Sequence, residues 1–337
     1  MIAVIIPSHN CAEFLGGAVR SAARGGSAVS EIVVVDDGSE DDTDEILAAL
    51  KLEEPRLRTI CFPENRGVQA ARYAGLQLSE SDYVAFLDAD DWVEPGCYDS
   101  LAEVATRTES DITISGIWAV STRENSPQTV RAEFEQEECY DDDLLGRFCR
   151  WQFRTGSLCN KLYRRELLLR EDIWATGSSI PINEDYIINI HAFAEAKRVC
   201  VSPIMGYYAY AREGSVTREN DGATNFTNMM AAYAAAAGLY RSRGEEVLQQ
   251  VDQLYRHQLQ FTDYQVENSD VFAPHSERLA LAAGDLVRLR PQLLHDWFND
   301  GRGNQIQNTP QPVSLSQCLR MRLACIVPRW IKDLIKS

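Results

Sequence analysis

The chain has 337 residues, of which 45% are hydrophobic, and this length suits one large α/β domain with a smaller appendage. The formal net charge of -17 argues against a nucleic-acid-binding protein, because recognition of a phosphate backbone needs a basic face. Nine cysteines without a C-x-x-C pair indicate free core thiols in a reducing compartment, rather than a disulfide framework or a zinc site.

Short apolar, β-branched runs alternate with helical stretches through the first 90 residues. Runs this apolar are typical of strands buried on both faces of a parallel sheet. The alternation predicts a doubly wound α/β sheet, whose ligands bind at the carboxyl ends of the strands. Strands are predicted at 2–7, 31–37, 57–62 and 82–88, and helices at 12–23, 42–50 and 67–78.

The later part of the chain divides at changes in composition. A helix at 97–108 and an alternating strand at 111–120 precede a polar connection at 123–138. Helices at 160–171 and 183–196 and a strand at 204–211 follow, and 225–297 is mostly helical. We therefore predict an α/β domain over 1–220, a helical region over 221–312 and a basic amphipathic tail over 313–337.

The tail has apolar residues at helical spacing, five basic side chains and one acid. An apolar stripe with flanking cations and Trp330 suits a membrane interface with anionic headgroups. A packed terminal helix, such as a homodimer contact, fits the same pattern. The apolar start of the chain lacks a basic leader, and no run is long enough to span a bilayer, so we expect a cytoplasmic protein.

The fourth predicted strand ends on Asp88-Ala89-Asp90-Asp91. A polar turn explains many Asp-rich strand ends. Three carboxylates this close repel one another, however, unless a cation or hydrogen-bond donors intervene. Asp90 and Asp91 offer the hard oxygen ligands that suit Mg²⁺ or Mn²⁺. The turn therefore predicts a site for a divalent metal and a diphosphate.

Two further polar clusters, Ser8-His9-Asn10 and Asp36-Asp37-Gly38-Ser39, follow the first two strands and should face the same crevice. Asp37 can accept the imide N–H of uracil or thymine, and Asp88 can accept from ribose hydroxyls. At the start of a later helix, Glu184-Asp185 is the candidate to deprotonate an acceptor hydroxyl, with helix capping as the alternative interpretation.

Seven segments in this order resemble one enzyme family: VIIPSHN, VVVDDGSEDDT, ENRGVQAARYAG, FLDADDW, NKLYRRELL, INEDYIINI and YYAYAREGSVT. The ordered set, over residues 2–217, is similar to the family-two inverting glycosyltransferases, especially the bacterial non-processive enzymes of surface-polysaccharide assembly. Gln69 and Tyr73 stand where Ser and Asn are usual in this family. Arg147 to Trp151 echoes the Q-x-x-R-W box of processive synthases but precedes Glu184-Asp185, so we interpret it as coincidence.

The resemblance implies the GT-A fold, a Rossmann-like mixed sheet flanked by helices, with a mostly helical C-terminal region. It makes 1–220 the catalytic domain. The implied sites are Pro7 and Ser8 at the nucleoside, Asp37 at the base, Arg72 as a further nucleotide contact, Asp88 near the ribose, Asp90 as the ligand of Mn²⁺ or Mg²⁺ with Asp91 supporting it, Asp185 as the general base, and Arg212, Ser215 and Thr217 on a loop over the donor phosphates.

The implied function is transfer of a hexose or N-acetylhexosamine from a UDP-sugar to a glycan or lipid-linked glycan in surface polysaccharide biosynthesis. The tail would then contact the cytoplasmic face of the inner membrane. The alternative is a sugar-nucleotide or glycan-binding scaffold without turnover, which would have no need of Asp185. A nucleotidyltransferase or a dehydrogenase is disfavoured, because PSHNCAEF after the first strand lacks the glycines that cradle phosphates.

Overall fold

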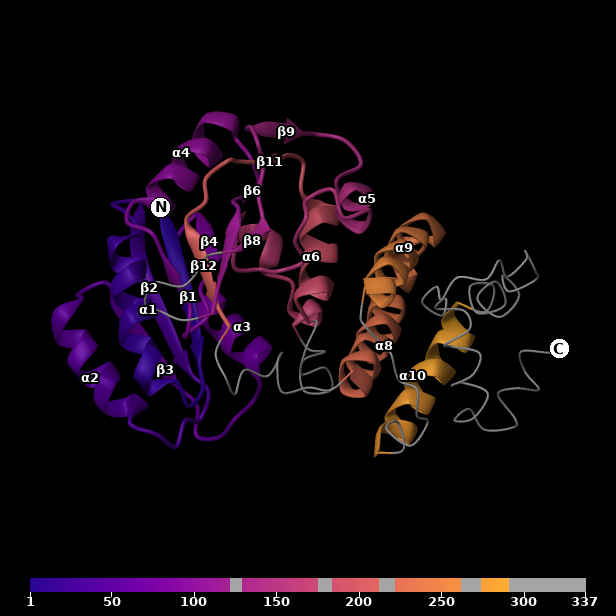
Figure 1. Ribbon diagram of the computed structural model, residues 1–337, viewed down its shortest axis with the longest axis horizontal. Helices are drawn as coiled ribbons and strands as arrows, with labels where there is room; N and C mark the ends of the chain where they lie inside the picture. Colours follow the sequence, from indigo (N-terminus) through magenta and orange to yellow (C-terminus); the bar gives the residue numbers. More distant parts are fainter. Residues whose placement is uncertain (122–128, 175–183, 212–221, 262–273, 291–337) are drawn as a thin grey trace. The chain divides into compact units, whose positions relative to one another are not determined.

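The computed structural model describes residues 1–121, 129–174, 184–211, 222–261 and 274–290 (Figure 1). The chain forms two compact units, Met1–Ser215 and Val216–Ser337, which we describe separately. The first unit combines strands and helices, and the described part of the second is helical.

The first unit is built on an eight-stranded mixed sheet with the order β3-β2-β1-β4-β10-β6-β11-β9. Its first four strands along the chain are parallel neighbours. All seven residues of β1 are buried, as expected of a strand covered on both faces. These strands are β1 (Ile2–Ser8), β2 (Val29–Asp36), β3 (Leu57–Cys61) and β4 (Tyr83–Phe86).

Helices follow each of the parallel strands, as the alternation in the sequence predicts (Figure 1). α3 packs on β1 and β2, and Gly75 permits the close approach, because a Cβ at this position would lie 2.5 Å from Cγ2 of Ile5. The predicted α/β fold with a GT-A type mixed sheet is therefore confirmed. The helices are α1 (Ala12–Arg24), α2 (Thr43–Glu53), α3 (Val68–Leu78) and α4 (Cys97–Thr108).

The helix predicted at 160–171 is wrong. Its first residues form β10 (Lys161–Arg164), which is antiparallel to both β4 and β6 (Ile112–Ile114). Leu, Arg and Glu favour helices locally, but Leu162 and Tyr163 are fully buried in the sheet. Tertiary burial overrides a weak local preference here. The remainder forms two short 3-10 helices, η1 (Arg165–Leu168) and η2 (Glu171–Ile173).

A second sheet of four strands has the order β5-β12-β7-β8. The single strand predicted at 111–120 is divided between the two sheets, because Ser115 and Gly116 separate β6 from β7 (Ile117–Val120). The connection predicted at 123–138 is also shorter than expected, since it includes β8 (Thr129–Ala132) and the first residue of β9 (Glu138–Tyr140). The other strands are β5 (Trp92–Val93) and β12 (Tyr207–Tyr210).

One cysteine pair contradicts the prediction of free thiols. Cys139 of β9 and Cys200 of β11 (Val199–Val201) face each other across antiparallel strands and form a disulfide. Sequence alone missed it because the two residues are 61 positions apart. Disulfides are rare in a reducing compartment, so the cysteines no longer argue for one. Cys11, Cys61, Cys97, Cys149 and Cys159 form no disulfide.

The described part of the second unit consists mainly of three helices, α8 (Gly222–Leu239), α9 (Glu245–Phe261) and α10 (Ser276–Leu289). α8 packs against both of the others. Buried Asp252 accepts hydrogen bonds from Tyr233 Oη and from the Arg290 guanidinium, which joins the residue after α10 to α9. Within the described ranges, every helix is too short or too polar to cross a bilayer. The tail predicted at 313–337 lies outside the described residues.

Candidate active site

The polar clusters predicted to share a crevice follow neighbouring parallel strands. Ser8 ends β1 directly opposite Asp36, which ends β2, and Pro7 lies opposite Val35. Ser8 is 3% exposed, and its hydroxyl has no hydrogen-bond partner among the described residues. A buried hydroxyl without a partner is costly, so it is well suited to meet a ligand at this edge.

Asp37 is buried and organises the loop that precedes α3. Its two carboxylate oxygens accept the backbone N–H groups of Arg66 at 2.7 Å and Gly67 at 2.8 Å. Gly38 makes the turn possible, because its φ of 68° is left-handed and a Cβ there would lie 2.5 Å from the carbonyl carbon of Glu64. Each Asp37 oxygen keeps a second lone pair for a ligand donor.

The acidic turn after β4 contains side chains with different surroundings. Asp91 is 6% exposed, and its carboxylate accepts from Tyr207 Oη at 2.5 Å and from the Tyr210 N–H at 2.7 Å. Burial and the neighbouring charges of Asp88 and Asp90 raise the pKa of Asp91 well above its usual value. Asp91 therefore ties the turn to β12, while Asp90 is half-buried.

The donor set of this turn fits a divalent cation. Three carboxylates stand in four residues, and repulsion among them contributes to the raised pKa of Asp91. Asp90 supplies a hard oxygen ligand of the kind that Mg²⁺ and Mn²⁺ prefer. Asp91 is more buried than Asp90, and both of its oxygens accept protein hydrogen bonds that hold the turn in place.

A different group in the described ranges also has metal-ligand spacing. Ligand atoms of Asp36, Asp44 and Cys61 lie within 4.8 Å of one another. Two of these residues are exposed, and exposed acids gather in this way on many surfaces without an ion. We assign no metal to this group.

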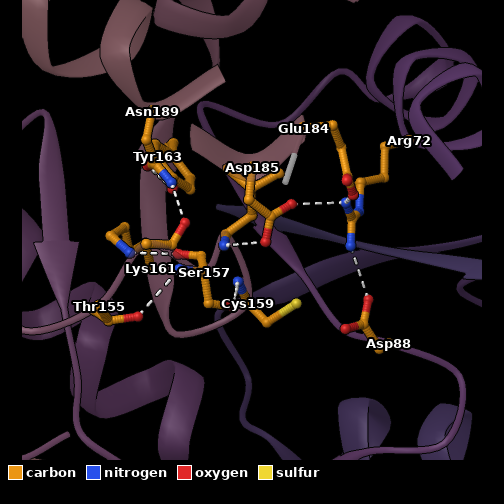
Figure 2. A network of polar contacts seen from close by, with 12 residues as sticks. Arg72, Asp88, Thr155, Ser157, Cys159, Lys161, Tyr163, Glu184, Asp185 and Asn189 are labelled. Atoms are coloured by element: carbon orange, nitrogen blue, oxygen red, sulfur yellow. Dashed lines mark hydrogen bonds and ion pairs between the residues drawn. The ribbon is translucent and has the colours of Figure 1, made fainter. Parts of the chain in front are cut away.

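Arg72 of α3 lies at the centre of a buried ionic network (Figure 2). Its guanidinium contacts Asp88 at 3.0 Å, Glu184 at 2.8 Å and Asp185 at 2.9 Å. Burial disfavours its charged form, but the three carboxylates outweigh this effect and raise the pKa of Arg72 well above its usual value. Arg72 therefore links the strand end at Asp88 to the acidic pair at the start of α6 (Glu184–Glu195).

Asp185 is held on both sides of its carboxylate. One oxygen pairs with Arg72, and the other accepts the backbone N–H of Leu158 at 3.2 Å. Its side chain is 23% exposed, so it can still meet a ligand, whereas that of Glu184 is 9% exposed. Burial, with the charge of Asp185 second, raises the pKa of Glu184 to about 8. Of the two acids, Asp185 is therefore the more accessible carboxylate.

Three further aromatic side chains have surroundings typical of wall and packing residues. His9 Nδ1 lies 2.8 Å from the carbonyl oxygen of Asp37, and His191 is buried in α6. Trp92 stacks on Tyr208 with ring centroids 5.4 Å apart.

Sequence reasoning missed the residues that hold the site in place. Tyr207 anchors Asp91, and the Leu158 amide and Lys161 lie beside Asp185. The NKLYRRELL segment includes Lys161, but it was interpreted as a helix, and Leu158 lies outside it. Predicted phosphate contacts of Arg212, Ser215 and Thr217 fall outside the described residues.

The mixed sheet flanked by helices is of the GT-A glycosyltransferase type. Residues 3–170 belong to glycosyltransferase family 2, since they match the family model described as "Glycosyl transferase family 2". The solved structure of S. aureus TarS 1-349 in complex with UDP is similar in fold, with a TM-score of 0.64 and 19% identity, over 87% of this chain and 82% of that one.

Two curated relatives agree with the family. The succinoglycan biosynthesis protein ExoO of Rhizobium meliloti (strain 1021) is 30% identical over 64% of this chain and 62% of its own length. An uncharacterized glycosyltransferase, EpsJ of Bacillus subtilis (strain 168), is 29% identical over 59% of this chain and 58% of its own. The chain thus matches less than two thirds of the length of either relative.

Proposed function

We propose that the protein transfers a hexose or N-acetylhexosamine from a UDP-sugar to a glycan or lipid-linked glycan acceptor, with inversion at the anomeric carbon. The observation that carries this proposal is the Arg72 network, which places an accessible carboxylate, Asp185, one guanidinium away from the strand end at Asp88. A second TarS 1-349 structure contains UDP-GlcNAc, which supports a UDP-sugar donor here. The ExoO relative supports a role in polysaccharide biosynthesis.

The donor would lie along the edge where β1, β2 and β4 end. Pro7 and Ser8 line its nucleoside, Asp37 accepts from the base, and Asp88 accepts from the ribose. Asp90, with Asp91 fixing the turn, would hold Mn²⁺ or Mg²⁺, and a metal bound there compensates the negative charge of the diphosphate. In this proposal, Arg72 holds Asp88 and Asp185 in place. Any contact of Arg72 with the nucleotide would be made from its buried position.

Asp185 then acts as the general base. It removes the proton from the acceptor hydroxyl, whose oxygen forms a bond to the anomeric carbon as the bond from that carbon to the diphosphate oxygen breaks. The electron pair of the broken bond leaves with UDP. Arg72 and the Leu158 N–H orient the carboxylate, since each holds a different oxygen of Asp185.

The substitution Asp185→Asn tests this assignment. It keeps the size of the side chain and removes the base, so turnover of UDP-sugars should fall by about 10²- to 10⁴-fold. UDP affinity should stay close to that of the wild type, because Asp185 meets the acceptor side. Equal turnover by the two proteins would contradict the assignment. A wild type that binds UDP but never releases sugar to water or acceptor would favour the non-catalytic scaffold.

We place the protein in the cytoplasm, with 313–337 as a peripheral contact to the inner membrane. The basis is the basic, apolar composition of this segment in a strongly acidic chain. Co-sedimentation with anionic vesicles should be lost on deletion of 313–337. Retained co-sedimentation would contradict the membrane contact, and a change from dimer to monomer on deletion would favour the packing alternative.

A further inference from the structure

The loop from Thr155 to Asn160 lies against the proposed base and is held by bonds among its own side chains (Figure 2). The hydroxyl of Thr155 donates to Asn160 Oδ1 at 3.3 Å and accepts the Ser157 N–H at 3.1 Å. Asn160 Nδ2 donates to the carbonyl of Ser115 at 2.5 Å. These hydrogen bonds hold the backbone of the loop in place. Within the loop, the Leu158 N–H donates to Asp185.

Helix α6 makes a second contact with the same loop, one helical turn after Asp185. Asn189, four residues after Asp185, donates to the carbonyl of Gly156 at 2.8 Å and accepts from Tyr163 Oη at 2.7 Å. Residues four apart on a helix share a face, so the loop meets α6 at two points. A Cβ on Gly156 would lie 2.3 Å from the ring of Tyr186, which shows how closely the backbone approaches α6.

Lys161 closes the loop from the opposite end. It is 1% exposed, and its ammonium donates to the carbonyl of Ser157 and to Asn160 Oδ1, the latter at 3.3 Å. A buried ammonium is costly, and an apolar side chain of the same length would fill this space without that cost. The carbonyl that Lys161 holds belongs to the residue just before Leu158, whose N–H meets the base.

Among the described residues, few charged groups act on Lys161. Asp185 of α6 faces it and favours its ammonium form, Arg131 of β8 opposes that form, and the nearby Cys159 is a buried thiol whose pKa is raised well above its usual value by burial. Burial lowers the pKa of Lys161 to about 7, so a fraction of the molecules carries the charge at neutral pH.

We propose that Lys161 is a positioning residue for the transfer reaction, which fixes the loop from Thr155 to Leu158 and keeps the Asp185 carboxylate oriented. This inference rests on the proposed function, because it assigns to Lys161 a role in supporting the general base. Lys161 does not reach the reacting atoms in this account, and it acts through Ser157 and Leu158.

The test compares Lys161→Met with the wild type and with the control Arg56→Met in the full chain. Arg56 also donates to backbone carbonyls, those of Val29 and Ala23, but at the β3 edge of the sheet. In Lys161→Met, we expect kcat to fall by about 10- to 100-fold, because a misplaced catalytic group loses rate. We expect KM for the UDP-sugar to change by less than about twofold, since donor contacts remain.

A second readout needs no activity. Hydrogen–deuterium exchange of peptides over residues 155–160 should be faster in Lys161→Met than in the wild type, and unchanged there in Arg56→Met. If Lys161→Met does not fold, Lys161→Gln replaces it, because it also removes the charge and is expected to change both readouts in the same direction.

Unchanged exchange, unchanged kcat, or a loss of kcat equal to that of Arg56→Met would each overturn the role of Lys161. A wild type that turns over no UDP-sugar would instead contradict the proposed function. In that case, the exchange rates test only whether Lys161 holds the loop. Equal rates in Lys161→Met and the wild type would contradict this structural role.

Discussion

At the scale of single residues, the acidic pair that opens α6 is divided between two environments. Asp185 keeps an exposed edge, while the side chain of Glu184 lies against Arg72 in the interior. One guanidinium thus serves three carboxylates, and the cluster of Arg72, Asp88, Glu184 and Asp185 has more negative than positive groups. A raised pKa at Glu184 relieves this imbalance, because its neutral form needs no counter-ion.

The pH dependence of stability should reflect Glu184. Its pKa is higher in the folded state, at about 8, than the usual value of 4.5, so between these values the folded protein binds more protons than the unfolded chain. Stability should therefore fall as the pH rises through this window. Glu184→Gln stays neutral throughout, and its Tm should fall less than that of the wild type between pH 5 and pH 8, as measured by thermal unfolding.

Glu31 is the matched control for this measurement. Burial tends to raise its pKa, but hydrogen bonds from Ser81, the Glu80 N–H and Arg58 outweigh burial and lower it. The sign is then opposite, so Glu31 stabilises the fold above its unfolded pKa and loses this effect in acid. Glu31→Gln should cost stability at neutral pH. Parallel pH profiles for the wild type and Glu184→Gln would contradict the assignment of a neutral Glu184.

At the scale of elements, the turn after β2 sets the loop that leads into α3. Gly38→Ala should destabilise the fold by about 1 to 3 kcal/mol from its left-handed φ alone. The total loss of stability in Gly38→Ala should exceed this value, because the added methyl would lie 2.5 Å from the carbonyl carbon of Glu64. Thermal unfolding measures the loss, and UDP affinity should also weaken, since Asp37 is held by this loop.

Gly96→Ala separates strain from contact. Gly96 has a φ of 78°, and nothing lies within 4 Å of a Cβ built there. Its substitution should cost only the strain and leave UDP affinity unchanged. If Gly38→Ala and Gly96→Ala lose equal stability and bind UDP equally well, the packing of residues 64–65 against the turn has no part in the nucleotide site.

The elements also show how far sequence reasoning reaches. The alternation of apolar runs predicted β1 to β4 and α1 to α4 to within a few residues, because strands buried on both faces and amphipathic helices leave strong local patterns. The prediction for the residues of β10 was wrong because the pairing partners of this strand, β4 and β6, lie far away along the chain. The disulfide was missed for the same reason. The motifs contain the candidate residues. The Arg72 network could not be predicted from them, because it forms only when α3, β4 and α6 come together in the fold.

At the scale of the whole molecule, family membership and fold belong to the first unit, where the family model matches. The second unit, described in α8 to α10, has a buried network of its own around Asp252. The proposed donor site lies at the strand ends of the first unit. Donor binding can therefore be tested without knowing the acceptor.

The central claim is a metal-assisted site for a UDP-sugar, and nucleotide binding tests it most directly. Thermal unfolding of the full chain is followed with UDP, dTDP, GDP or CMP, each with Mn²⁺ and with EDTA. A ligand that binds the folded state raises its Tm by mass action. We expect UDP with Mn²⁺ to raise the Tm, and EDTA or Asp90→Ala to abolish most of the increase. If no nucleotide raises the Tm under any condition, the claim is contradicted and the protein has this fold without its donor chemistry.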